Sequence, residues 1–168
     1  MNRLLVLGGA RSGKSRYAQR RMETHEGRLA YIATAEAGDA EMADRIVRHQ
    51  QDRGPHWQTV EAPIALPSAI NEASTHAEAI LVDCLTLWLS NLMLGDHDVI
   101  EAGNALVGSV RRCSVPIALI ANEVGLSIVP VNALARRFRD GAGWLNQKLA
   151  EAADEVVFIA AGLPLRLK

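Results

Sequence analysis

Short apolar runs alternate with longer, more polar stretches along this chain. The runs at 4–7, 79–83 and 116–121 are almost continuously apolar, a pattern typical of strands that are buried on both faces of a sheet. Gly162 and Pro164 mark a turn near the C-terminus, so the last two apolar runs are expected to pair with each other. The predicted strands are 4–7, 29–34, 57–61, 79–83, 116–121, 156–160 and 163–167.

The stretches between these runs carry apolar residues at helical spacing. In 39–53, for example, Met42, Ala43 and Ile46 fall on one face. Gly141 and Gly143 are candidate kink points of the last helix. The predicted helices are 14–24, 39–53, 67–74, 85–94, 99–112 and 133–153. This alternation, in a chain of 168 residues, predicts one doubly wound α/β domain over residues 1–168 with a mainly parallel sheet.

A glycine-rich motif joins the first predicted strand to the first predicted helix. Residues 8–15 read GGARSGKS, which fits the phosphate-loop pattern G-x-x-x-x-G-K-[S/T]. Such a loop turns several backbone N–H groups and a helix N-terminus toward one anion. We therefore expect a nucleoside triphosphate here rather than a merely structural glycine turn. The predicted phosphate contacts are Gly8, Gly9, Ala10, Arg11, Ser12, Gly13, Lys14 and Ser15.

A metal ion normally accompanies the triphosphate in such sites. The Ser15 hydroxyl is the expected Mg²⁺ ligand within the loop. Asp83, which ends the apolar run at 79–83, is the expected carboxylate ligand, although it also suits the N-cap of the next helix. Glu123, after the run at 116–121, is the alternative ligand.

Charge and composition restrict the other partners. A net charge of −1 gives no electrostatic reason to expect nucleic acid, and the run Arg136, Arg137 and Arg139 is expected to be a solvated helix face. No apolar run approaches the length of about 20 residues that a membrane span needs, so a cytoplasmic protein is expected. Cys84 and Cys113 lack metal-site spacing and are expected to be free thiols.

The predicted helix 39–53 carries three basic side chains at intervals of four residues: Arg45, His49 and Arg53. They lie along one ridge of the helix. An arginine-flanked histidine suits a triphosphate, but an exposed structural histidine is the simpler interpretation of this helix on its own. None of the histidines is spaced for a zinc site.

Several separated stretches resemble one family. GGARSGKS at 8–15, YIATA at 31–35, EMADRIVRH at 41–49, NEVGLSIVP at 122–130 and ARRFRDGAGWLNQKLAEAADEV at 135–156 are similar to bifunctional adenosylcobinamide kinases / adenosylcobinamide-phosphate guanylyltransferases of cobalamin biosynthesis. The last two stretches are the most specific, and the resemblance runs from about residue 4 to 168.

The resemblance implies two reactions. ATP or GTP phosphorylates adenosylcobinamide, and GTP then donates GMP through a guanylylated histidine to adenosylcobinamide phosphate, giving adenosylcobinamide-GDP. The motif histidine falls at His49, which replaces the structural interpretation above. The resemblance also suggests a homo-oligomer, for which a trimer is one form. Beyond the loop, the implied nucleotide contacts are Ala33, Thr34, Ala35, Gln50, Gln51, Asp52, Arg53, Glu61 and Asp83.

Two residues depart from the family pattern. Arg48 stands where a second histidine is common, and Asp83 stands where glutamate is common. The segment near 95–98 also looks short. Two other functions stay open: a small-molecule kinase in which His49 is unreactive, and a nucleotide-dependent switch subunit that needs a protein partner.

Overall fold

A computed structural model describes residues 3–35 and 54–168, and the predicted helix 39–53 lies outside the described residues. The strands form one seven-stranded sheet in the order β3-β2-β4-β5-β1-β6-β7. Neighbouring strands from β1 to β6 are parallel, and β7 alone is antiparallel to its partner, β6. The strands are β1 (Arg3–Gly8), β2 (Leu29–Ala33), β3 (Trp57–Glu61), β4 (Ala79–Asp83), β5 (Ile117–Asn122), β6 (Glu155–Ala160) and β7 (Leu163–Arg166).

Each described helix begins and ends within two residues of its predicted bounds. They are α1 (Lys14–Met22), α3 (Leu66–Ala73), α4 (Leu85–Leu94), α5 (Val99–Arg112) and α6 (Ala133–Ala152). Helix α6 continues without interruption through Gly141 and Gly143, the predicted kink points. Glycine keeps its backbone N–H, so the helical hydrogen bonds can continue through it as they cannot through proline. Within the described residues, no helix combines the length and the apolarity that crossing a membrane would require.

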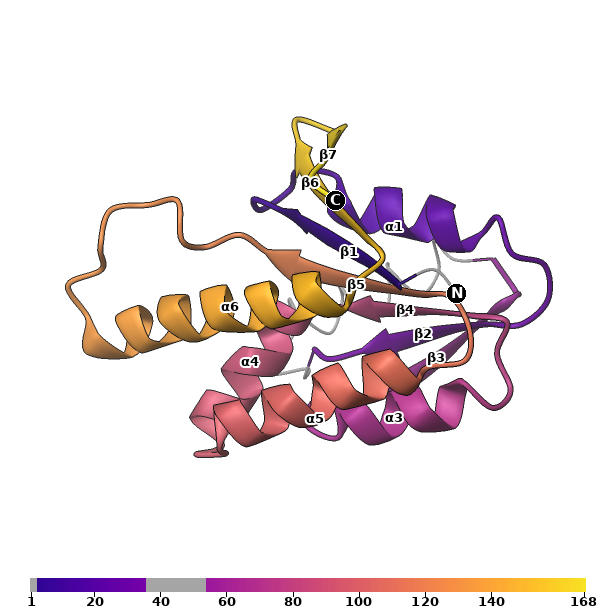
Figure 1. Ribbon diagram of the computed structural model, residues 1–168, viewed down its shortest axis with the longest axis horizontal. Coiled ribbons are helices and arrows are strands. Elements are labelled where there is room, and N and C mark those ends of the chain that lie inside the picture. The colour runs from indigo at the N-terminus through magenta and orange to yellow at the C-terminus, as the bar shows by residue number, and fades with distance from the viewer. Residues whose placement is uncertain (1–2, 36–53) are drawn as a thin grey trace.

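Helices cover both faces of the sheet, as the doubly wound prediction requires (Figure 1). Side chains alternate between the faces along each strand. Leu4 and Val6 of β1 therefore pack on the α1 side with Ala18, whereas Leu5 and Leu7 belong to the larger core that α3, α4, α5 and α6 cover. Strand β4 is buried from Ala79 to Val82 and only half-buried at Asp83, and ligands of such sheets bind at the carboxyl ends of the strands.

Candidate active site

The phosphate loop connects the end of β1 to the start of α1. Its glycines adopt backbone angles that side chains rarely allow: φ is 150° at Gly8 and 100° at Gly13. A Cβ atom on Gly8 would also collide with the carbonyl oxygen of Ile159 on the neighbouring strand β6. Glycine is therefore required at these two positions by both conformation and space.

Lys14 occupies the centre of this loop. Its side chain is only 6% exposed, and its Nζ donates a hydrogen bond of 2.5 Å to the carbonyl oxygen of Gly9. Burial lowers the pKa of Lys14, while the nearby Cys84 and Asp83 act in the opposite direction. None of the ion pairs among residues 3–35 and 54–168 includes Lys14. A largely desolvated ammonium beside a helix N-terminus is suited to an incoming anion.

The carboxyl ends of the parallel strands bring the predicted site residues to one edge of the sheet. Ala33 stands in register with both Glu61 and Asp83, and β5 links β4 to β1, on which the loop begins. The prediction that Lys14 and Asp83 share an edge is thus confirmed. Their charges interact, although β5 lies between β4, which ends at Asp83, and β1, which leads into the loop.

Tyr31 orients the Asp83 carboxylate. The Tyr31 hydroxyl donates a hydrogen bond of 3.2 Å to Asp83 Oδ2. The Tyr31 ring meets Trp57 edge to face, with ring centroids 6.2 Å apart. Sequence reasoning missed this role because a tyrosine inside a predicted strand is normally assigned to the core. The available signal was the tyrosine hydroxyl itself, since the hydroxyl of a buried tyrosine usually has a hydrogen-bond partner.

Thr34 uses its side chain to hold the strand ends together. Its buried Oγ1 accepts a hydrogen bond from Cys84 N at 2.9 Å and donates one of 2.7 Å to Cys84 O. The Thr34 carbonyl oxygen accepts another from Asn91 Nδ2 at 2.8 Å. The hydroxyl of Thr34, a predicted nucleotide contact, is therefore already hydrogen-bonded within the protein. Ala33 and Ala35 have no polar side-chain group.

Both cysteines are free, as predicted, and both are buried. Cys84 follows Asp83 directly, and its pKa is raised by burial and by the neighbouring Asp83 charge. Burial likewise raises the pKa of Cys113. Raised pKa values keep both groups in the thiol form, which is a poor nucleophile.

Glu123, the alternative metal ligand, also lies at this edge. Its N–H donates to the carbonyl oxygen of Gly8 at 3.0 Å, which places it directly beside the loop. Its carboxylate accepts a hydrogen bond of 2.6 Å from Gly125 N. Glu123 therefore has a partner within its own turn, while Asp83 is held by a side chain of another strand.

Two further sets of predicted residues remain, 49–53 and the arginine run. His49, Gln50, Gln51, Asp52 and Arg53 lie outside the described residues. In the arginine run of α6, Arg136 donates to the carbonyl oxygen of Pro130 at 3.0 Å, and Arg139 pairs with Asp140 at 2.8 Å. These arginines have local partners, as expected for a helix face.

Comparison with known proteins gives the family. A sequence model described as cobinamide kinase / cobinamide phosphate guanyltransferase matches residues 4–167, which include the whole phosphate loop and every strand of the sheet. The chain belongs to this family. The match agrees with the resemblance inferred from the motifs.

Three curated members of the family are similar along nearly their whole length. Bifunctional adenosylcobalamin biosynthesis protein CobP of Pseudomonas aeruginosa is 46% identical over 166 residues, covering 98% of this chain and 96% of the relative. The proteins of the same description named CobU from Escherichia coli and Salmonella typhimurium are 41% and 39% identical over 180 residues, covering 98% of this chain and 99% of each relative.

Proposed function

We propose that this chain catalyses both reactions in the description of its family. In the first, it phosphorylates the free hydroxyl of adenosylcobinamide with ATP or GTP. In the second, it transfers GMP from GTP to adenosylcobinamide phosphate, forming adenosylcobinamide-GDP and releasing pyrophosphate. The observation that carries this proposal is the buried Lys14 within a phosphate loop, at the same sheet edge as Asp83.

The kinase step uses the loop. The substrate hydroxyl oxygen attacks the γ-phosphorus, the bond to the β,γ-bridging oxygen breaks, and the nucleoside diphosphate leaves. Backbone N–H groups of 8–15 and the Lys14 ammonium hold the phosphates and offset the charge that develops on their oxygens. Glu123, which lies beside the loop, is the carboxylate proposed to receive the hydroxyl proton.

The donor set also fits Mg²⁺. Ser15 follows Lys14 in the first turn of α1, and Asp83 lies at the same edge, so a hydroxyl and a carboxylate are available as hard oxygen ligands. The ion would supply additional positive charge to the phosphate oxygens. Because Asp is one methylene shorter than the Glu common in the family, a water-mediated contact is expected at Asp83.

The guanylyl step uses His49. Its unprotonated ring nitrogen attacks the α-phosphorus of GTP and pyrophosphate leaves. A phosphate oxygen of adenosylcobinamide phosphate then attacks the same phosphorus, and the N–P bond breaks to free the histidine. A histidine with an ordinary pKa of about 6.5 is largely neutral near pH 7, and a covalent intermediate divides one difficult transfer into two easier ones. Arg45 and Arg53, one predicted helical turn away on either side, supply charge for the phosphates.

The remaining implied contacts are proposed to bind the guanosine part of GTP. Glu61 ends β3 and is exposed at the same edge as Ala33 and Asp83. An exposed carboxylate is able to accept hydrogen bonds from the ribose or the base. Gln50, Gln51, Asp52 and Arg53 are assigned to nucleotide binding by the family resemblance.

Labelling with GTP tests the histidine directly. We expect α-labelled GTP to transfer its label to the chain, and the adduct to be labile to acid and stable to base, as a phosphoramidate is. His49→Ala should abolish labelling and retain much of the kinase rate. The matched control is His56→Ala, since His56 is exposed in the turn before β3 and has no proposed role. Undiminished labelling of His49→Ala would refute the assignment.

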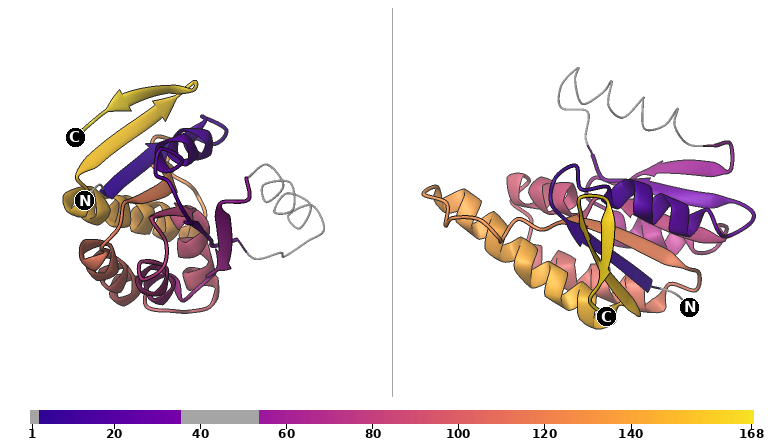
Figure 2. Two further views of the ribbon diagram at one scale, coloured as in Figure 1. Left: turned by 90° about the vertical axis from the view of Figure 1, so that its right-hand side faces the viewer. Right: turned by 90° about the horizontal axis from the view of Figure 1, so that it is seen from above.

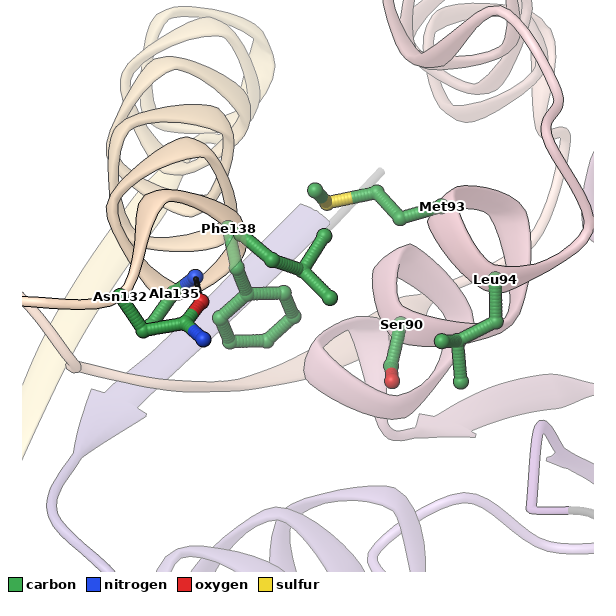
Figure 3. A pocket seen from close by; sticks show the side chains of 7 residues that line it. Ser90, Met93, Leu94, Asn132, Ala135 and Phe138 are labelled. Carbon is green, nitrogen blue, oxygen red and sulfur yellow. Dashed lines mark hydrogen bonds between the residues drawn. The ribbon is translucent and has the colours of Figure 1, made fainter.

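We also propose that the chain acts as a homo-oligomer, with a trimer as the form that the family resemblance suggests. The segment between β5 and α6 exposes Leu126 to 82%, Ile128 to 93% and Val131 to 97%. Large apolar side chains gathered in one exposed segment are typical of a protein–protein contact. Next to them, α4 and α6 enclose an apolar hollow of about 280 Å³ (Figure 3). It is lined by Ser90, Met93, Leu94, Asn132, Leu134, Ala135 and Phe138.

Light scattering at micromolar concentration tests the oligomer. The native chain should have a multiple of the monomer mass, and Ile128→Asp with Val131→Asp should reduce it to the monomer mass. A monomeric native chain would contradict this proposal but would leave the catalytic proposal intact.

The cytoplasmic location stays a prediction of the sequence.

A further inference from the structure

The C-terminal hairpin ends in a tight turn that lies against the phosphate loop. Strands β6 and β7 pair up to Ala160 and Leu163, so Ala161 and Gly162 form a two-residue turn. Their φ angles are 51° and 80°, the positive values that a type I′ hairpin turn requires. Figure 2 shows the tip of the yellow hairpin beside the indigo segment that leads into α1.

Two contacts join the turn to the loop. Gly162 N donates a hydrogen bond of 2.8 Å to the carbonyl oxygen of Ser12. A Cβ atom on Gly13 would lie 3.3 Å from the Cα atom of Gly162, so these two backbones approach more closely than side chains would permit. The contact is thus one between two main chains.

This hydrogen bond fixes the orientation of one peptide group of the loop. In a planar trans peptide, the C=O and the following N–H point in opposite directions. Because the Ser12 carbonyl points to the hairpin, the Gly13 N–H points away from it. The Ser12 side chain adds no restraint, since its buried Oγ has no hydrogen-bond partner among the described residues. Among the described residues, the adjoining backbone also makes a longer bond, 3.4 Å, from Ser12 N to Gly9 O and one of 3.0 Å from Tyr17 N to Gly13 O. Neither bond involves the Ser12 carbonyl or the Gly13 N–H, the two ends of the peptide group in question.

We propose that Gly162 is a positioning residue of the nucleotide site, whose N–H holds the Ser12–Gly13 peptide so that the Gly13 N–H is presented to the phosphates. The proposal rests on the phosphate-binding role proposed above for residues 8–15. Loss of the Gly162 N–H should weaken nucleotide binding without unfolding the hairpin, because other hydrogen bonds hold the hairpin to the domain. Leu167 N donates to Val156 O at 2.8 Å, and Lys168 Nζ donates to Ala153 O at 2.7 Å.

The decisive variant replaces a single N–H by oxygen. Gly162 lies close enough to the C-terminus for a synthetic peptide carrying glycolic acid at this position to be ligated to the rest of the full chain. The resulting ester cannot donate to Ser12. The matched control is the corresponding ester at Arg166. Since Leu167 N bonds across to Val156, alternation along an antiparallel pair turns the Arg166 N–H toward the open edge of the sheet.

Binding of a non-hydrolysable GTP analogue is measured together with the unfolding temperature. We expect the ester at 162 to raise Kd about 3- to 10-fold over the control ester, the range for one lost backbone hydrogen bond, with equal unfolding temperatures. The nucleotide KM should rise correspondingly while the corrinoid KM does not change. Equal Kd values for the two esters would overturn the proposal, as would a loss of binding that is matched by a loss of stability.

Two further variants make the outcome specific. Gly162→Asn keeps the N–H and tolerates positive φ, and open space surrounds the position of its Cβ, so it should bind the analogue as the native chain does. If it loses as much affinity as the ester at 162, the shape of the turn and not its N–H is responsible. Lys14→Ala distinguishes the proposed phosphate site from the proposed role of Gly162. If Lys14→Ala binds the analogue normally, the phosphate-site proposal itself fails. If it binds weakly while the ester at 162 matches the control ester, only the hairpin proposal fails.

Discussion

Helix α1 carries a basic side chain near each end, and the two have opposite electrostatic surroundings. At its first residue, Lys14 is buried and donates to a neutral carbonyl oxygen, that of Gly9. In the last turn of the helix, Arg21 is paired. Its Nη1 and Nη2 atoms reach the two Glu155 carboxylate oxygens at 3.0 and 2.7 Å, and Nη1 also donates to the Tyr17 hydroxyl at 2.9 Å.

The pKa values follow this difference. Burial lowers the pKa of Lys14 because desolvation disfavours the ammonium form. The hydrogen bonds to Glu155 raise the pKa of Arg21 and lower that of Glu155. A paired arginine between α1 and β6 stabilises the fold. A buried lysine without a carboxylate partner in an ion pair costs stability until an anion binds, which is the property expected of a binding residue.

The largest effect should come from removing the Lys14 ammonium. Lys14→Ala is expected to lower the kinase rate by about 10²–10³, the loss typical for one group that stabilises developing charge, with the fold retained. Initial rates with adenosylcobinamide and saturating nucleotide measure it, and circular dichroism checks the fold. A near-normal rate in the folded variant would be incompatible with the role given to Lys14.

Breaking the pair at the other end should affect stability alone. Glu155→Gln leaves the Arg21 guanidinium without its counter-charge. Because both side chains reach solvent, with exposures of 30% and 19%, the expected cost is about 1–2 kcal/mol in the free energy of unfolding. Urea titration at pH 7 measures it. If Glu155→Gln lowered the kinase rate per enzyme molecule as much as Lys14→Ala does, the two ends of α1 would not differ in function.

The same pair predicts a pH dependence. The Glu155 pKa is lowered in the folded state from its ordinary value of 4.5. Between the two values the unfolded chain binds a proton that the folded chain does not, so the stability from this pair is complete above about pH 4.5 and is lost as the pH falls through the folded pKa. The stability difference between the native chain and Glu155→Gln should therefore shrink toward acid pH. A constant difference from pH 7 to pH 3 would contradict this prediction.

The smallest effect is expected from replacing Lys14 by an apolar side chain of similar length. Lys14→Met removes a buried charge and should raise the free energy of unfolding by up to about 1 kcal/mol without nucleotide. The gain should decline as the pH rises, because the lowered pKa of Lys14 lets the folded chain lose the proton first. Thermal unfolding at pH 7 and pH 10 tests this. A destabilised Lys14→Met would mean that the ammonium contributes to the empty fold.

Much of this architecture is predictable from local sequence. All the described strands lie within one residue of their predicted bounds, because continuous apolar runs identify strands buried on both faces. The phosphate loop is equally local, since eight consecutive residues contain its glycines, its lysine and its hydroxyl. The helix-period stretches were similarly clear. The predicted kinks of α6 are the exception, because glycine keeps the backbone N–H that continues the helical hydrogen bonds.

Contacts between distant segments could not be predicted in this way. The contacts of Tyr31, Asp83 and Gly162 depend on which strands are neighbours in the sheet, and local sequence patterns do not predict the strand order. A polar residue at a strand end is equally compatible with a helix cap, a turn or a ligand, so the sequence offers Asp83 and Glu123 as alternatives, and the strand order adds that both lie at the edge of the phosphate loop. Gly103 shows the same limit, because only the packed structure reveals that a Cβ there would lie 2.5 Å from Trp144.

The class of fold, the phosphate loop and the family can all be recognised without coordinates, since each depends on residues that are neighbours along the chain or on motifs long enough to be specific. Only the tertiary structure decided that Tyr31 holds Asp83 across 52 residues and that the turn at Gly162 supports Ser12 near the other end of the chain. Such contacts depend on which strands are neighbours: β2 lies beside β4, and β6 lies between β1 and β7. That order is set by how whole helices and strands pack against one another, and no local pattern encodes it.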